Sequence, residues 1–157
     1  MVTTKEPTLS FTSALVRLAH LVQQVFGEVS REHDLTPQQT QLLCLLVGGP
    51  VGMGELSRAL HLEKSSLTGL VDRAEKRGLV MRTRSSRDRR ACLIELTGEG
   101  RRMGELAHEG VAARLEALAG DLPAGHRDLL ASAVEALLAE HAASAPRSGP
   151  RSGPERA

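Results

Sequence analysis

Apolar residues recur every three or four positions through the first part of the chain, the spacing that places side chains on one face of a helix. Between residues 10 and 32 this row consists of Leu15, Leu18, Val22, Val25 and Val29. A second helix is predicted from Pro37, because Thr36 and Gln39 have the spacing of a capping box and proline suits the first helical position. The Gly-Gly-Pro run at residues 48–50 would end that helix.

Two shorter helices are predicted next, separated by little more than a turn. The first has the sequence MGELSRALHL from Met53 and carries a short apolar side. In the second, over residues 63–77, apolar side chains fall at positions i, i+3, i+4 and i+7, namely Leu67, Leu70, Val71 and Ala74. That spacing predicts one buried stripe and leaves the rest of the helix surface polar. Gly78 is expected to end the helix.

After Gly78 the period changes from that of a helix to that of a strand. The runs LVMRTR and RACLIELT are predicted to be the two strands of a hairpin, joined by SSRDR at residues 85–89. Cys92 has the same parity as Ile94 and Leu96, so it is expected to pack with them on one face of the sheet.

Two further helices complete the predicted fold. Thr97 can cap one over residues 98–118, and an apolar row predicts a last helix that ends near His141; the row consists of Leu129, Leu130, Val134, Leu137 and Leu138. The predicted element order is therefore α-α-α-α-β-β-α-α. Two short helices followed by a hairpin form a winged helix-turn-helix, so the expected fold class is mainly α.

The helices at the two ends carry more apolar surface than so small a winged module can cover, which favours a two-fold dimer. The predicted organisation is a flexible N-terminus (1–9), a first dimerisation helix (10–35), a winged helix-turn-helix lobe (36–97), C-terminal dimerisation helices (98–142) and a disordered tail (143–157). The tail repeats Pro-Arg-Ser-Gly and has nothing to bury, so no structure is expected there.

Charge is unevenly distributed along the 157 residues. The net charge of the whole chain is +1, but residues 58–90 hold ten lysines and arginines against four acidic residues and carry +6. Positive charge gathered in one part of a nearly neutral protein is typical of a surface that faces a polyanion. A basic face that contacts only solvent is the alternative that charge alone leaves open.

Several classes of protein are disfavoured. The longest apolar stretch, residues 42–47, is too short to span a membrane, and the first nine residues lack the pattern of a secretion signal, so a cytoplasmic location is expected. No catalytic constellation or phosphate-binding glycine loop is present, so neither an enzyme nor a cofactor is expected. The six histidines are scattered and predict no metal site. Cys44, inside LLCLLV, is interpreted as a small core residue rather than a reactive thiol.

Two runs in the middle of the chain are specific in their order and spacing: ELSRALHLEKSSLTGLVDRAEKRGLVMR and SSRDRRACLIELTGEG. Their most specific parts are LTGLVDRAEKRGLV and Asp88-Arg89-Arg90 followed by LTGEG. On these motifs the chain resembles the MarR family of bacterial transcription regulators. The resemblance covers nearly the whole chain and implies a homodimer, tied together by its terminal helices, with two winged lobes on duplex DNA.

The resemblance also implies that a small phenolic ligand or an oxidant can weaken DNA binding in many relatives. Zinc-sensing relatives have a pair of histidines four residues apart, but here His108 is followed by Ala112. Hydroperoxide-sensing relatives have a cysteine near the start of the first helix, and residues 11–21 contain none. An effector of this chain is therefore left without a predicted identity.

A helix that enters the major groove of DNA needs a slim polar face. The start of the helix over residues 63–77 offers such a face: the hydroxyls of Ser65, Ser66 and Thr68 can bond to base edges, and Gly69 allows close approach. Lys64 and Arg73 are expected to contact phosphates, which fix the register of the protein on DNA. An ordinary surface helix is the alternative interpretation.

The predicted wing, residues 82–91, is expected to enter the minor groove, whose negative potential attracts arginine. The resemblance implies that Arg90 corresponds to the wing arginine that enters the minor groove in MarR proteins. Asp88 can hold the guanidinium of Arg90 in a fixed direction. Arg84, Arg87 and Arg89 are expected to clamp the DNA backbone, as is Arg82 if its face of the strand allows. A solvated turn with a weak surface ion pair is the alternative.

The sequence therefore predicts a homodimeric, sequence-specific regulator of transcription that binds double-stranded DNA, most simply a repressor on an inverted-repeat, palindromic operator. The alternative from another class is a winged-helix module that binds proteins and no longer binds DNA. The Asp88/Arg90 pair and the basic segment favour the DNA-binding interpretation.

Overall fold

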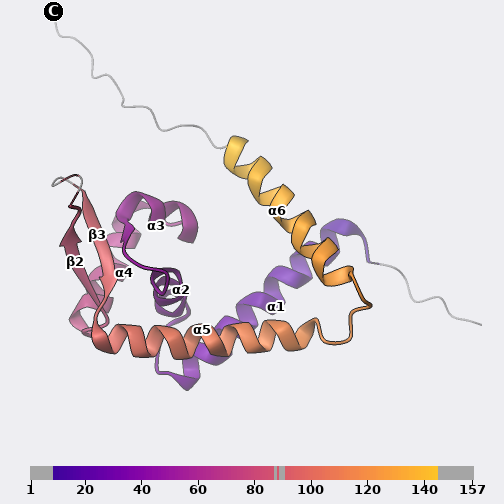
Figure 1. Cartoon of the computed structure of the whole chain (residues 1–157), viewed down its shortest axis with the longest axis horizontal. Coiled ribbons are helices and arrows are strands. Elements are labelled where there is room, and N and C mark those ends of the chain that lie inside the picture. The colour runs from indigo at the N-terminus through magenta and orange to yellow at the C-terminus, as the bar shows by residue number, and fades with distance from the viewer. Residues whose placement is uncertain (1–8, 87, 89–90, 145–157) are drawn as a thin grey trace, which may run out of the picture. The chain divides into compact units, whose positions relative to one another are not determined.

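A computed structural model gives the structure of the chain and describes residues 9–86, 88 and 91–144 (Figure 1). Within these residues the order of elements is the predicted one with one addition, a short strand before the third helix. The elements are α1 (Phe11–Glu32), α2 (Pro37–Leu46), β1 (Val51–Gly52), α3 (Met53–Leu60), α4 (Lys64–Lys76), β2 (Val80–Arg84), β3 (Cys92–Leu96), α5 (Gly98–Leu118) and α6 (His126–Ser144).

The ends of the first helices are set by the capping residues that the sequence indicates. The backbone N–H of Gln39 donates to the Thr36 hydroxyl, and the Thr36 N–H donates to Oε1 of Gln39, each over 3.1 Å. This closes the predicted capping box and places Pro37 in the first turn of α2. Gly78 adopts a φ of 70° just beyond α4, so the predicted glycine stop is confirmed as well.

The winged lobe consists of α2, α3 and α4 packed with a three-stranded antiparallel sheet in the order β1-β3-β2 (Figure 1). The predicted buried stripe of α4 is confirmed, since all four of its apolar side chains join the main hydrophobic core. Val51 pairs with Ile94 across the sheet, so the short segment between α2 and α3 supplies an edge strand that the sequence analysis does not predict. Two residues are too few for a strand period to be visible in the sequence.

The prediction that Cys92 is packed is wrong, because its side chain is exposed. It shares a face of the sheet with Ile94 and Leu96, as parity requires, and those two side chains are buried. Cys92 pairs with Arg84 at the hairpin end of the strand, whereas the main core contains the far end, where Val80 pairs with Leu96. Parity fixes the face that a side chain occupies but not how far the core extends along the strand.

The turn between α3 and α4 is closed by hydrogen bonds within it. His61, the C-cap residue of α3, takes a left-handed conformation with a φ of 51°. The N–H of Leu62 donates to the carbonyl of Ser57 over 3.1 Å, and the Ser57 hydroxyl donates to the Leu62 carbonyl over 2.6 Å. These bonds satisfy groups that the end of α3 leaves open and fix where α4 begins.

The long helix α5 is joined to the lobe at its first turn. Thr97 accepts from the N–H of Gly100 over 3.0 Å, as its predicted capping role requires, and its own hydroxyl donates to the Gly78 carbonyl. Gly100 lies so close to the backbone of Leu79 that a Cβ there would overlap the Leu79 carbonyl. A glycine this early in a helix lowers its intrinsic stability, but here it is required by the backbone contact.

A second, smaller core joins α1 to α5 beside α2. It contains Val25 and Val29 from α1 with Ala107 and Val111 from α5. Next to it the buried hydroxyls of Ser30 and Thr40 share a hydrogen bond of 2.7 Å, which satisfies two polar groups at the crossing of α1 and α2.

Residues 119–157 form a separate unit in which α6 is the described helix. Its predicted apolar row is exposed in the single chain, with Leu129 at 68% and Leu138 at 64% of full exposure. The predicted flexible N-terminus and disordered tail fall largely on residues 1–8 and 145–157, outside the described residues. Among the described helices, none combines the length and apolar character that a membrane span needs.

Replacing Gly100 by alanine should lower the free energy of unfolding by about 1–3 kcal/mol, the usual cost of inserting a methyl group into a packed contact. The matched control is Gly98→Ala, where nothing lies within 4 Å of the new Cβ. Alanine favours the helix, so that variant should be neutral or more stable. Urea unfolding curves measure both, and equal midpoints for the two variants would contradict the close contact.

Candidate nucleic-acid interface and ligand cavity

The exposed face of α4 forms an open groove at the start of the helix. Its lining brings together four predicted site residues with two acidic residues, and consists of Glu63, Lys64, Ser65, Thr68, Gly69 and Asp72. Ser66 is exposed on the neighbouring turn, and Arg73 is exposed two turns after Ser66. The side opposite the buried stripe is therefore slim and polar, as the major groove of DNA requires.

The hydroxyls on this face differ in what they can offer a ligand. Thr68 donates its hydroxyl hydrogen to the Lys64 carbonyl over 2.8 Å, which leaves the oxygen as an acceptor and the methyl group for apolar contact. Ser65 and Ser66 have no partner within the described part of the chain, so each can both donate and accept. The ammonium group of Lys64 is likewise without an ion pair there.

Gly69 makes room for the side chain of Arg73. A Cβ on Gly69 would stand 3.2 Å from Nη1 of Arg73, so the guanidinium lies back along the helix toward the groove. The small residue expected to allow a close approach of DNA thus also sets the direction of a cation one turn further on.

Arg82 ties the wing strand to α4. Val80, Arg82 and Arg84 share one face of β2. From that face Arg82 reaches Asp72 on α4, with Nη2 2.6 Å from Oδ1, and it also pairs with Glu75. The hydrogen bond to Asp72 is the largest of the effects that raise the pKa of Arg82. Both carboxylates neutralise this cation, so Arg82 is a structural tie between β2 and α4, a role that sequence reasoning missed. Its conditional contact with the DNA backbone stays a prediction.

Arg84, one pleat further along β2, is the next cation toward the hairpin. It is exposed and has no ion pair within the described part of the chain, so it is available to a phosphate. The turn that follows is closed by the N–H of Ala91 donating to the Asp88 carbonyl over 3.0 Å. The remaining predicted wing residues, Arg87, Arg89 and Arg90, lie outside the described residues, as does any geometry of the Asp88/Arg90 pair.

The far end of α4 is joined to the start of α2. Nη1 of Arg77, the C-cap residue, donates to Oε1 of Gln39 over 3.0 Å, and its guanidinium lies 3.9 Å from Asp34. Gln39 therefore serves both the capping box of α2 and the anchoring of α4. The helix α4 is thus fixed at its end by a hydrogen bond and along its length by Arg82.

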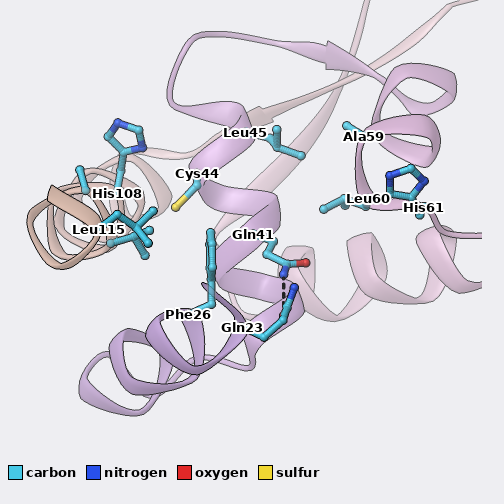
Figure 2. A pocket seen from close by; sticks show the side chains of 12 residues that line it. Gln23, Phe26, Gln41, Cys44, Leu45, Ala59, Leu60, His61, His108 and Leu115 are labelled. Carbon is cyan, nitrogen blue, oxygen red and sulfur yellow. Dashed lines mark hydrogen bonds between the residues drawn. The ribbon is translucent and has the colours of Figure 1, made fainter. Parts of the chain in front are cut away.

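A cavity of about 550 Å³ lies between the lobe and the helices α1 and α5 (Figure 2). Such a volume is typical of sites that hold small organic ligands. The lining comes from four helices and consists of Gln23, Phe26, Gln41, Cys44, Leu45, Ala59, Leu60, His61, His108, Val111, Ala112 and Leu115. None of these residues was predicted as a site, because spacing within each helix does not reveal which helices face one another.

Polar groups on the cavity wall are few. Nε2 of Gln41 donates to Oε1 of Gln23 over 3.4 Å, the bond drawn in Figure 2. Cys44 is half-buried on the wall rather than inside the core, and burial raises the pKa of its thiol. Across the described ranges, no three histidine, cysteine or acidic side chains gather closely enough to hold a metal ion.

Comparison with known proteins finds similar sequences and similar folds among transcription regulators. Residues 33–91 match the model of the MarR family. An uncharacterized HTH-type transcriptional regulator of Bacillus subtilis (strain 168), YsmB, is 33% identical over 99 residues, which cover 62% of this chain and 68% of that protein.

Two solved structures are similar over most of the chain. The transcriptional repressor CouR bound to a 23-mer DNA duplex is 30% identical, with a TM-score of 0.70 over 88% of this chain and 99% of that one. NadR in complex with 4-hydroxyphenylacetate is 29% identical, with a TM-score of 0.72 over 92% of this chain and all of that one. By name, YsmB is a transcriptional regulator and CouR a transcriptional repressor.

The two thiols should differ in their reaction with iodoacetamide at pH 8. Cys92 is exposed, whereas Cys44 is half-buried with a raised thiol pKa, so it presents less of the reactive thiolate. Mass spectrometry of the native protein should find Cys92 alkylated first, by about tenfold or more in rate. In urea the difference should disappear, and faster native modification of Cys44 would contradict the burial described here.

Proposed function

The chain belongs to the MarR family of DNA-binding transcription regulators, and we propose that it acts as a homodimeric repressor on an inverted-repeat operator. The observation that carries this proposal is the outward face of α4, opposite a fully buried stripe. It presents small hydroxyl residues and a lysine that has no ion pair among the described residues. A regulator that binds DNA would work in the cytoplasm, and it would do so by binding rather than by catalysis.

In the proposed complex α4 enters the major groove. Ser65, Ser66 and Thr68 contact base edges, and Gly69 lets the helix come close. Lys64 at the start of α4 contacts phosphate, and that role is supported by its ammonium group, which forms no ion pair within residues 9–86, 88 and 91–144. Arg73, whose guanidinium lies toward the groove, is well placed to bind a phosphate at its edge.

The wing is proposed to enter the adjacent minor groove. Arg90 would insert there with Asp88 as its orienting partner, while Arg84, Arg87 and Arg89 would contact the backbone. The tie from Arg82 to Asp72 and Glu75 supports this arrangement, because it holds the base of the wing at a fixed angle to the recognition helix. Because α4 and the wing are already held together, they can enter the two grooves without a further loss of conformational entropy on binding.

The apolar rows on α1 and α6 support the proposed dimer. Each helix exposes large apolar side chains in the single chain, among them Phe11 at 69%. Exposed rows of this kind usually mark an interface. We propose that residues 10–35 and 98–142 supply the dimer contacts, so that two lobes meet half-sites about 34–36 Å apart, one turn of the DNA helix.

The cavity is proposed to hold a small-molecule effector. It lies beside the lobe, and its wall includes His61, the first residue of the turn that leads from α3 into α4. NadR has been solved in complex with 4-hydroxyphenylacetate, which supports a ligand role for the related fold of this chain. A ligand that favours one position of the lobe would alter the fit of the dimer to its operator.

The DNA contacts can be tested on an operator selected from random duplexes by the purified protein. Arg90→Ala and Asp88→Ala should each weaken specific binding by about tenfold or more, while Lys64→Ala should lower the salt slope of binding by about 1. Lys76→Ala at the end of α4 removes an exposed cation outside both the predicted contact set and the proposed dimer ranges, and serves as the control.

Fluorescence anisotropy over a series of salt concentrations measures these effects. Wild-type affinity in Arg90→Ala would contradict the wing assignment. If no duplex were selected at all, the winged-helix protein-binding module would replace the repressor as the favoured function.

The dimer can be tested by placing a charge on the apolar rows. Leu129→Glu and Leu15→Glu should each convert the dimer to a monomer, because a carboxylate would have to be buried at the interface. Met81→Glu is the matched control, since Met81 is an exposed apolar residue of the winged lobe with 42% exposure. Sedimentation velocity should find that control still dimeric. If the Leu129→Glu and Leu15→Glu variants also stay dimeric, the interface lies elsewhere.

A further inference from the structure

We infer that the cavity selects an uncharged, largely apolar ligand with a hydrogen-bonding group, and rejects the corresponding carboxylate. The inference rests on the proposed effector role of the cavity and adds the chemical class of the molecule that fits there. It follows from the residues that line the cavity. The expected ligand is uncharged, unlike the carboxylate 4-hydroxyphenylacetate in the NadR complex.

The wall offers no group of fixed charge. Among the described residues that line the cavity there is no lysine, arginine, aspartate or glutamate. Seven of the twelve are apolar, and the polar ones are two glutamines, two histidines and Cys44. The helix α2, which supplies the middle of the wall, has no charged residue in its whole length.

The arginines of the neighbouring helices do not compensate for this. None of them belongs to the described lining. Arg58 on α3 donates from Nε to the Gly54 carbonyl over 3.3 Å. Arg114 on α5 is engaged by two carboxylates of α1, with its Nε 3.8 Å from Glu28 and its Nη2 bonded to Glu32. Moving either guanidinium to the cavity would break these contacts.

A carboxylate inside such a wall would lose hydration without gaining a counter-ion. The transfer of an unpaired carboxylate out of water is far more costly than that of an amide or a hydroxyl group that finds a hydrogen bond. An uncharged ligand can make that bond here. Gln41 uses one N–H for Gln23 and keeps its carbonyl oxygen, and His108 has no partner within the described part of the chain.

The placement of these groups fits a ligand with an apolar body. Figure 2 shows His108 on α5 and Gln41 on α2 at separate points of the wall, with the ring of Phe26 between their helices. The apolar body would pack on Phe26, Leu60 and Leu115, and its polar group would reach Gln41 or His108.

Matched pairs of small aromatic acids and their primary amides test the inference: benzoate with benzamide, phenylacetate with phenylacetamide, and cinnamate with cinnamamide. Calorimetric titration of the full-length dimer at pH 8, above the ordinary range of histidine titration, gives the affinities. In every pair that binds, the amide should bind at least about tenfold more tightly. An acid that binds as tightly as its amide, or the failure of all six compounds to bind at millimolar concentration, would overturn it.

Variants locate the binding and the source of the preference. Gln41→Lys places a cation on the wall and should reverse the preference toward the acids, whereas Gln38→Lys, exposed on the same helix outside the lining, should leave it unchanged. Ala112→Phe should fill the cavity and abolish amide binding, and the adjacent Ala113→Phe should not. Amide binding that survives Ala112→Phe would place the ligand elsewhere and overturn the inference.

DNA binding is measured separately, so that the two proposals can fail independently. If the ligand-free dimer binds its selected duplex but prefers the acids, the ligand inference alone is wrong. If the amides bind in the predicted order but no duplex is bound, the repressor function is wrong and the selectivity of the cavity stands. Release of the duplex by amide, but not by acid, supports both.

Discussion

The structure depends first on the single apolar face of α4. Leu67, Leu70, Val71 and Ala74 are all buried, and their burial fixes the rotation of the helix about its own axis. Because a helix repeats every 3.6 residues, the same constraint turns Ser65 and Ser66 outward. The surface proposed to meet DNA is thus determined from inside the protein, by the hydrophobic core rather than by contacts among the polar residues.

The rotation of α4 does not by itself determine where the wing lies. The position of β2 beside α4 is fixed by ion pairs. Asp72 and Glu75 lie next to the buried stripe and point toward β2, where Arg82 binds both. Surface ion pairs stabilise a fold only weakly, by about 0–1 kcal/mol each. Their contribution here is geometric, since a guanidinium that bonds to two acids on one helix limits the angle between strand and helix.

Much of the fold follows from the sequence because it is encoded locally. The capping box at Thr36, the stop at Gly78 and the stripe of α4 are all set by residues within a few positions of one another, and each agrees with the structure. What could not be predicted involves partners distant in sequence. The sequence leaves the role of Arg82 dependent on its face of the strand, because nothing in β2 alone points to acids ten and seven residues earlier. The cavity wall comes from four helices and has no pattern in any one of them.

The role of Gly100 also depends on a residue distant in sequence, Leu79, and could not be predicted from its own helix. Its backbone rests directly on that of Leu79, the residue that leads into β2, with no side chain between them. Flexible side chains at a joint allow two elements to slide by small repacking, whereas backbone against backbone leaves no slack. The start of β2 and the first turn of α5 are therefore held in one fixed contact, and neither can shift there without moving the other.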